Sequence, residues 1–342
     1  MRVFENPWRG QTLPDPVLED IPMPSVAANV VEALLQQCPV AKETPLVQAS
    51  GFSCSTWIKD ERERMGLGSF KALGAAYVIA CDASETGATD MTRALAGRTY
   101  VTASAGNHGL SVAAGARVFG ADAVVYLAQT VPESFAGRLR DKGAQVVRAG
   151  AEYEASMEAA MHAAAANDWI LLSDTSWPGY LAQPHRLMEG YLAMAAEAAR
   201  SIPATPSHIF LQAGVGGLAG ACAAYFREVW GDVPQIIVVE PQEAPALQAA
   251  AEAGKFVTAT GDVSVMGRLD CKEASLIALN GLTRDADLFV TISEDESAAI
   301  LPALAAQDLA TTESGGAGLA ALKLMNLQPS SVALCILSEM EQ

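Results

Sequence analysis

Three kinds of feature are missing from this chain of 342 residues, and each absence narrows the class of protein. No run of about 18 apolar residues occurs, so the sequence offers no segment that could cross a membrane as a helix. The N-terminal stretch MRVFENPWRGQTLPDP contains no apolar segment of signal-peptide length. We therefore expect a cytoplasmic protein that makes no contact with a membrane.

Basic residues are scarce, because 22 Lys and Arg stand against 39 Asp and Glu, giving a net charge of −17. Nucleic-acid binding needs a basic surface that displaces counterions from phosphates. We therefore expect no nucleic-acid partner. Any anionic ligand must be held by local features, such as the first turn of a helix.

Paired cysteines and clustered histidines are also missing. The six cysteines are scattered without a CxxC pair, which is typical of reduced, packed thiols and argues against a disulfide framework or a zinc site. No group of His, Cys and Asp has the spacing of metal ligands, so we expect no catalytic metal. Structural roles are expected for the four histidines, including His108, whose loop is described below.

The chain is rich in residues that pack helices closely onto sheets. Hydrophobic residues make up 51% of the sequence, and Ala and Gly supply much of that fraction. Apolar strands alternate with helical stretches of about a dozen residues, which predicts parallel sheets covered by helices on both faces. The clearest strands are expected at 55–60, 98–104, 121–129, 144–150, 169–174, 208–214, 235–241, 288–293 and 331–338.

In parallel α/β sheets, ligands collect on the loops that follow the carboxyl ends of strands, and three such loops carry unusual residues. The first is Gly66 to Lys71, which places Lys71 at the start of a helix. The helix dipole there favours a neutral amine, the form that a Schiff-base nucleophile needs. The alternative is a solvated surface lysine.

The second loop, Thr102 to Gly109, lies between a strand and a helix and combines small residues with two hydroxyls. Free backbone amides at a helix start can cradle a carboxylate. Asn107 could bond a ring hydroxyl. Alternatively, Ser104 or Asn107 only caps the turn.

The third loop is Gly214-Val215-Gly216-Gly217-Leu218, where glycines would let the backbone approach a phosphate at a helix start. The same run is close to a dinucleotide fingerprint, and Glu240 ends the next strand about where a ribose-binding acid would lie. An NAD-dependent dehydrogenase is therefore an alternative. Against it, such fingerprints open the first βαβ unit, whereas this loop follows a long α/β stretch.

Four ordered motifs, GSFKALGAAY, TASAGNHG, QAGVGGLAG and VEP, give the chain a family resemblance. From about Pro45 onward the sequence resembles the fold-type II pyridoxal-phosphate enzymes, the tryptophan synthase β-like superfamily. Within that group it is most similar to the diaminopropionate ammonia-lyases, through KDERERMGLGSFKALGAAY, SDTSWPGYLAQPHRLMEGY and TTESGGAGLAAL, and next to the serine and threonine dehydratases.

The resemblance implies a role for each motif. Lys71 is the residue joined to the cofactor aldehyde, and Asn107 bonds the cofactor's 3-hydroxyl. Ser338 faces the pyridine nitrogen, where a neutral hydroxyl suits β-elimination better than transamination. The phosphate is held by the backbone amides of Gly214, Val215, Gly216, Gly217 and Leu218, and the substrate carboxylate by Thr102, Ser104, Ala105 and Gly106.

Asp174 ends the strand expected at 169–174 and is similar to an acid that lies near the substrate amine in the ammonia-lyases. A carboxylate there would favour a β-ammonium substrate over serine, or Asp174 only caps the turn that follows. Ammonia-lyases of this group often carry an acid in the second loop that serves one substrate enantiomer. Here that position is Ala105, as in threonine dehydratases, which argues against action on both enantiomers.

These features predict an α/β enzyme of two domains, each with a parallel-rich open sheet covered by helices, and pyridoxal phosphate in the cleft between them. We expect a large domain formed by residues 1–91 and 169–342, and a small inserted domain at 92–168. The expected activity is elimination of ammonia from a small amino acid, foremost 2,3-diaminopropionate to pyruvate. The alternative of the same fold is a serine, threonine or 3-hydroxyaspartate dehydratase. The resemblance also implies a homodimer.

Overall fold

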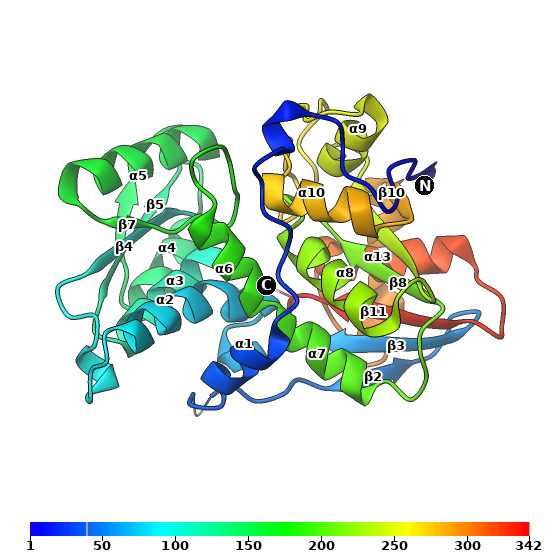
Figure 1. Cartoon of the computed structure of the whole chain (residues 1–342), viewed down its shortest axis with the longest axis horizontal. Coiled ribbons are helices and arrows are strands. Elements are labelled where there is room, and N and C mark those ends of the chain that lie inside the picture. Colours follow the sequence, from blue (N-terminus) through cyan, green and yellow to red (C-terminus); the bar gives the residue numbers. More distant parts are fainter. Residues whose placement is uncertain (39, 342) are drawn as a thin grey trace.

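The computed structural model describes residues 1–38 and 40–341, and its strands form two separate sheets (Figure 1). Within the described residues the larger sheet has seven strands, in the order β1 (Arg2–Glu5), β10 (Leu288–Ile292), β9 (Gln235–Pro241), β8 (His208–Gln212), β11 (Val332–Leu337), β3 (Ser55–Asp60) and β2 (Leu46–Ala49). The inner strands are parallel, and only the edge strands β1 and β2 pair antiparallel. Continuous apolar runs such as VALCIL suit this arrangement because both faces of a parallel sheet are buried.

The smaller sheet is parallel throughout, in the order β6 (Gln145–Arg148), β5 (Asp122–Leu127), β4 (Thr99–Ala103) and β7 (Ile170–Leu171). The predicted fold class, α/β with two parallel-rich sheets covered by helices, is confirmed. The limits of the two domains stay a prediction. β7 pairs with β4 although it follows the expected boundary at residue 168, because the chain completes the smaller sheet before it crosses to the larger one.

Helices cover both faces of the larger sheet. Successive residues of β8 alternate between two cores, since Ile209 and Leu211 pack on one side and Phe210 on the other. The first core is closed by α7 (Leu192–Ser201), α8 (Gly217–Trp230), α9 (Ala246–Ala253) and α10 (Leu276–Asp285), and the second by α12 (Leu301–Ala305) and α13 (Glu313–Met325). In Figure 1, α8 and α10 lie in front of the larger sheet.

The smaller sheet is covered in the same way. Tyr100 of β4 points into the first core with α2 (Gly74–Glu85), α3 (Asn107–Val118) and α4 (Glu133–Asp141). Its neighbour Val101 packs on the other face, under α5 (Tyr153–Asn167). The first core runs without interruption from one sheet to the other, and α2 packs against both α3 and α6 (Ala182–Gly190). The remaining elements are η1 (Pro16–Leu18), α1 (Ala28–Leu35), η2 (Arg64–Gly66), η3 (Phe70–Leu73), η4 (Met91–Arg93) and α11 (Glu294–Ala298).

The helical stretch between residues 182 and 201 is interrupted, and the break matters for the site. α6 ends at Gly190 and α7 begins at Leu192. A Cβ at Gly190 would lie 2.2 Å from the carbonyl oxygen of Leu73, so only glycine lets α6 approach the end of η3 this closely. The interruption places Tyr191 between the segment that carries Lys71 and the start of α8.

Three other elements were not expected from the sequence. The first is β1, which precedes the first of the predicted strands, at 55–60. β1 is an edge strand and mostly exposed, so it carries no apolar alternation. Helices α9 and α10 were also missed. No helix in the described part of the chain has the length and apolar character needed to cross a membrane.

Candidate active site

Lys71 lies in η3, just beyond the loop that follows β3, and its amine forms an ion pair with the carboxylate of Asp174. Asp174 follows β7, so the pair joins the ends of strands from the two sheets. The side chains of Lys71 and Asp174 are 22% and 18% exposed, which leaves the pair reachable from solvent. The fold therefore brings together, in one site, an amine and an acid that lie 103 positions apart in the sequence.

The charges of this pair correct one expectation. Burial lowers the pKa of Lys71, but the carboxylate of Asp174 outweighs burial, and the pKa of Lys71 lies above its ordinary value. Burial raises the pKa of Asp174, but Lys71 outweighs it, and the pKa of Asp174 lies below its ordinary value. The neutral amine expected from the helix dipole alone is therefore wrong for this pair, because a full opposite charge in contact exceeds a partial charge at a helix end.

The glycine loop forms the start of α8 as expected. Gly216 has φ +96° and caps the helix, and no side chain caps it. A Cβ at Gly216 would lie 2.9 Å from Cβ of Ala278, and one at Gly214 would lie 3.0 Å from Sγ of Cys271. The first backbone amides of α8 therefore stay available to an anion, in the geometry that helix starts use for phosphate.

Tyr191 joins Lys71 to this glycine loop. Its ring lies 4.9 Å from the ring of Phe70, centroid to centroid, and 3.6 Å from the position that a Cβ of Gly217 would take. Among the described residues, the hydroxyls of Tyr191 and Ser69 are buried without a hydrogen-bond partner. Buried hydroxyls without a partner are costly, so a polar group of a bound ligand within their reach would stabilise the site.

The second loop follows β4 and leads into α3. Oγ of Ser104 accepts hydrogen bonds from the backbone N–H groups of Gly106 at 3.2 Å and Gly109 at 3.1 Å, so Ser104 does stabilise the turn. The hydroxyl of Thr102 is buried without a partner within the described residues. Ala105 lies beside them and packs partly against the first core. The turn-capping role is thus present, and substrate binding by this loop stays a prediction.

The contacts of His108 are those of a buried packing residue. Its Nε2 lies 2.8 Å from the carbonyl oxygen of Leu172, and its ring is buried. Burial is the largest effect and lowers the pKa of His108; the charge of Asp174 opposes it, and the charge of Lys71 lowers the pKa further. A neutral His108 fits the predicted structural role.

The chain's C-terminal segment closes the site from a third side. Ser338 is buried directly after β11, and its carbonyl oxygen accepts from the N–H of Phe70 at 3.0 Å. Met340 donates its N–H to the carbonyl oxygen of Gly68 at 3.0 Å. These bonds place Ser338 next to the segment of Lys71, although no contact tests its predicted role toward a pyridine nitrogen.

Four residues of the site were missed by sequence reasoning: Tyr191, Arg268, Cys271 and Glu339. Cys271 was expected to be one of the packed thiols. Burial and Asp174 raise its pKa to about 12, which keeps the thiol protonated. No local sequence pattern marks these four residues, because they reach the site only through the packing of segments that are distant in the sequence.

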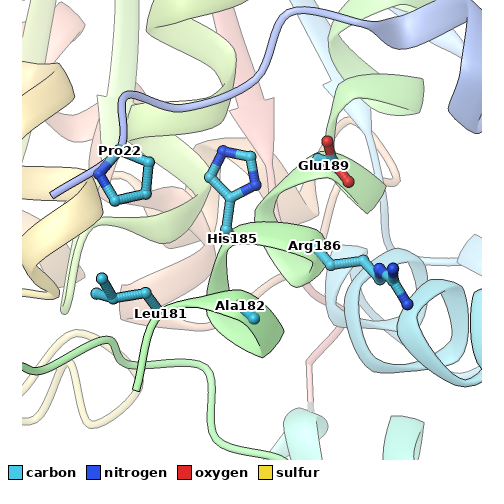
Figure 2. A pocket seen from close by; sticks show the side chains of 6 residues that line it. All are labelled: Pro22, Leu181, Ala182, His185, Arg186 and Glu189. Carbon is cyan, nitrogen blue, oxygen red and sulfur yellow. The ribbon is translucent and has the colours of Figure 1, made fainter. Parts of the chain in front are cut away.

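Two of the hollows formed by the described residues bear on the site. One, of about 430 Å³, lies between the N-terminal segment and α6 and is lined by Pro22, Leu181, Ala182, His185, Arg186 and Glu189 (Figure 2). None of the predicted site residues lines it. The other, of about 340 Å³, is lined in part by Thr175, Ser176 and Trp177, so it begins next to Asp174. Within residues 1–38 and 40–341, no group of three His, Cys, Asp or Glu could hold a metal ion.

Glu240 argues against the dehydrogenase alternative. It is fully buried, and its two carboxylate oxygens accept from the backbone N–H groups of Leu247 at 2.7 Å and Gln248 at 2.8 Å. The acid that the sequence places where a ribose would bind is therefore engaged by the start of α9. The glycine loop remains an anion site without the acid that a dinucleotide needs.

The matches with known proteins agree with this geometry. Residues 39–339 match the pyridoxal-phosphate dependent enzymes, and the chain belongs to that family. It is similar to diaminopropionate ammonia-lyase of Salmonella typhimurium, with 33% identity over 70% of this chain and 65% of that protein, and more weakly to human L-serine dehydratase/L-threonine deaminase, with 30% identity over 58% of this chain and 58% of that protein. The crystal structure of diaminopropionate ammonia lyase from Escherichia coli in complex with D-serine superposes with a TM-score of 0.86 and 27% identity, covering 99% of this chain and 94% of that one. The predicted family, and the order of the two subgroups within it, are confirmed.

The residues present fit pyridoxal phosphate. An amine at Lys71, an uncapped glycine-lined helix start at 214–218 and the unsatisfied buried hydroxyl of Tyr191 between them match an aldehyde, a phosphate and a polar ring substituent, respectively. When bound, this cofactor withdraws electrons from the Cα of an amino acid and so makes its proton acidic. The dehydrogenase alternative is therefore set aside.

Proposed function

We propose that this chain is an ammonia-lyase that eliminates the β-amine of 2,3-diaminopropionate. Water then hydrolyses the resulting 2-aminoacrylate, so that the products are pyruvate and two molecules of ammonia. The observation that carries the proposal is the ion pair of Lys71 and Asp174 at the open side of the site. A carboxylate beside the proton-carrying amine is suited to a substrate whose leaving group is itself a cation. The similarity to diaminopropionate ammonia-lyases over most of the chain supports the same substrate.

Each site residue has a role in this proposal. The glycine loop and Ser338 hold the cofactor, and Asn107 orients it. The loop from Thr102 to Gly106 binds the substrate carboxylate. With substrate in the site, Lys71 would accept the Cα proton and donate a proton to the leaving amine. Asp174 binds the β-ammonium group and keeps Lys71 oriented.

Replacing Asp174 with Asn should lower kcat/KM for diaminopropionate about 10- to 100-fold more than for serine, since a hydrogen bond to a charged group contributes about 1.5–3 kcal/mol. The measurement is the rate of 2-oxo acid formation from each substrate by the purified protein. Asp168→Asn is the matched control, because Asp168 is an exposed aspartate at φ +55°, which Asn tolerates. Equal losses on both substrates would assign Asp174 a structural role and remove the argument for a cationic leaving group.

Ala105 predicts that the protein acts on one enantiomer of diaminopropionate in preference to the other. With no acid in the second loop, a proton can be removed only from the side of Lys71, so one enantiomer of diaminopropionate should react at least about 100-fold faster than the other. Ala105→Asp should raise the rate on the slow enantiomer, whereas Ala105→Asn should not. Assays on the separate enantiomers test this, and equal rates with the natural protein would contradict it.

A dehydratase acting on serine, threonine or 3-hydroxyaspartate is the second candidate. Ala105 favours it, because this residue matches the threonine dehydratases at that position. Turnover of serine in preference to diaminopropionate would establish it. We further propose that the protein works as a cytoplasmic homodimer, with a large domain of residues 1–91 and 169–342 and a small domain of 92–168. Six free thiols support a reducing compartment, and family resemblance supports the dimer.

A further inference from the structure

A buried hydroxyl without a partner lies between the two halves of the site, on Tyr191. The residue is 1% exposed, and its hydroxyl forms no hydrogen bond within the described residues. Burying an unpaired hydroxyl destabilises a protein, and phenylalanine would fill the same space without that cost. The oxygen of Tyr191 therefore indicates a partner that arrives with a ligand.

The ring of Tyr191 spans from the segment of Lys71 to the glycine loop. Its hydroxyl oxygen lies 2.9 Å from the position that a Cβ of Gly74 would take, at the start of α2, so any side chain there would collide with the phenol. The ring carbon Cε2 lies 3.6 Å from the position that a Cβ of Gly217 would take, at the first residue of α8. The hydroxyl thus lies in the space between the end of η3 and the start of α8.

Packing fixes this ring. Tyr191 lies at the break between α6 and α7, and its backbone N–H donates to the carbonyl oxygen of Met188 at 3.1 Å. The ring of Phe70 meets it edge-on. Leu187 borders the same space, with its Cδ2 3.0 Å from the Cβ position of Gly74. A phenol held in this way presents a bound group with a donor that is already oriented, which lowers the entropy lost on binding.

The protonation state of Tyr191 suits a donor. Burial raises the pKa of Tyr191, the charge of Lys71 lowers it and the charge of Asp174 raises it, so that the pKa lies above its ordinary value. The phenol therefore stays protonated and can donate its O–H to an anion. Asn107 and Ser338 are proposed to bind the cofactor's 3-hydroxyl and ring nitrogen, and the phosphate arm is the polar substituent proposed to lie at the start of α8.

We propose that the hydroxyl of Tyr191 donates a hydrogen bond to the phosphate group of pyridoxal phosphate and so completes the anion site at the start of α8. This inference rests on the proposed role of the glycine loop, whose backbone amides bind the same phosphate. The net charge of −17 provides no general attraction for an anion, so the site depends on local donors. A hydrogen bond to a charged acceptor is stronger than one between neutral groups.

Tyr191→Phe removes only the oxygen and tests the proposal directly. It should weaken the binding of pyridoxal phosphate about 10- to 100-fold, the factor that a hydrogen bond to a charged group contributes. The affinity for pyridoxal, which lacks the phosphate, should stay unchanged. The measurement is a titration of the full-length protein, freed of cofactor, with each compound. Tyr225→Phe is the control, because Tyr225 is a half-buried tyrosine further along α8, and it should bind both compounds as the natural protein does.

Thermal unfolding gives a second readout that needs no turnover. Without cofactor, Tyr191→Phe should unfold at the same temperature as the natural protein or at a higher one, because it removes an unpaired buried hydroxyl. With pyridoxal phosphate, the rise in unfolding temperature should be smaller for the variant, because stabilisation by a ligand follows its affinity. A cofactor-free variant that unfolded at a lower temperature would contradict the inference, since the hydroxyl would then bond a group of the protein itself.

The two compounds separate the inference from the site assignment on which it rests. Unchanged affinity of Tyr191→Phe for pyridoxal phosphate would overturn the inference. Equal weakening of pyridoxal phosphate and pyridoxal would overturn it too, because the hydroxyl would then act on the ring or on Lys71. If the natural protein bound pyridoxal as tightly as pyridoxal phosphate, the glycine loop would hold no phosphate, and the proposed cofactor site would be wrong as a whole.

Discussion

Lys71→Ala should abolish covalent attachment of the cofactor and lower turnover by about 10³-fold or more. The estimate follows because one amine serves as the attachment point and as the base, and general acid–base catalysis alone contributes about 10²–10⁴-fold. Borohydride reduction followed by mass spectrometry should add the mass of the cofactor to the natural protein and not to the variant. The rate of 2-oxo acid formation gives the loss of turnover.

The matched control is Lys255→Ala, which removes a lysine whose side chain is exposed. It should keep both the mass shift and the activity. If Lys71→Ala retained either a reducible link to the cofactor or the full rate, residue 71 would not be the attachment point, and the glycine loop would have to serve another ligand.

Glu197→Ala should give the largest loss of stability, about 3–5 kcal/mol, because it breaks a buried ion network: Lys59 loses its carboxylate partner, and Arg64 loses one of its two. Oε2 of Glu197 lies 2.5 Å from Nζ of Lys59 and 2.6 Å from Nη2 of Arg64. Arg64 also pairs with Glu61 at 2.7 Å, and Thr44 donates to Glu61 at 2.5 Å. Lys59, Glu61 and Arg64 are at most 1% exposed.

The network ties β3 and η2 to α7, directly before the loop that leads to Lys71, so its loss should also weaken cofactor binding. Glu43→Ala is the control, because Glu43 pairs with Arg200 at a side-chain exposure of 61%, and surface pairs contribute only about 0–1 kcal/mol. Urea unfolding of both variants measures the difference. A change below about 1 kcal/mol in Glu197→Ala would show that the two cations find other partners or water.

The network also predicts the direction of a pH effect. Burial raises the pKa of Glu197, but the hydrogen bonds and charges of Arg64 and Lys59 outweigh burial and hold the pKa below its ordinary value. A carboxyl whose folded-state pKa is depressed stabilises the fold above its unfolded pKa, and this contribution is lost as the pH falls through the folded value. The stability difference between the natural protein and Glu197→Ala should therefore shrink in acid.

Much of the scaffold and the location of the site could be predicted from local patterns. Apolar runs such as QIIVVEP match β9 residue for residue, and each of the three loops connects the end of a strand to the helix that follows it. The glycines at 214 and 216 could be singled out because a close approach and a positive φ exclude larger residues. Edge strand β1 could not, since its four residues are mostly exposed and show no apolar alternation.

The charges were harder to predict, because their effect depends on contacts between distant segments. Lys71 was expected to be neutral from its own helix, and the acid that reverses this lies in a different sheet. Glu240 looked like a ligand-binding acid until α9 was seen to occupy both of its oxygens. Ser338 was noticed and Glu339, the next residue, was not, since only the fold brings Asn107 and Arg268 to it.

The sequence by itself determined the class of fold, the family, the lysine and the glycine-lined helix start, because strand periodicity, glycine placement and ordered motifs are written in neighbouring residues. Only the tertiary structure decided which acid faces which base, that Tyr191 joins the two halves of the site, and that Glu339 holds Asn107. Electrostatic and hydrogen-bonding partners are chosen by distance in space, and segments hundreds of residues apart acquire those distances only when the two sheets come together.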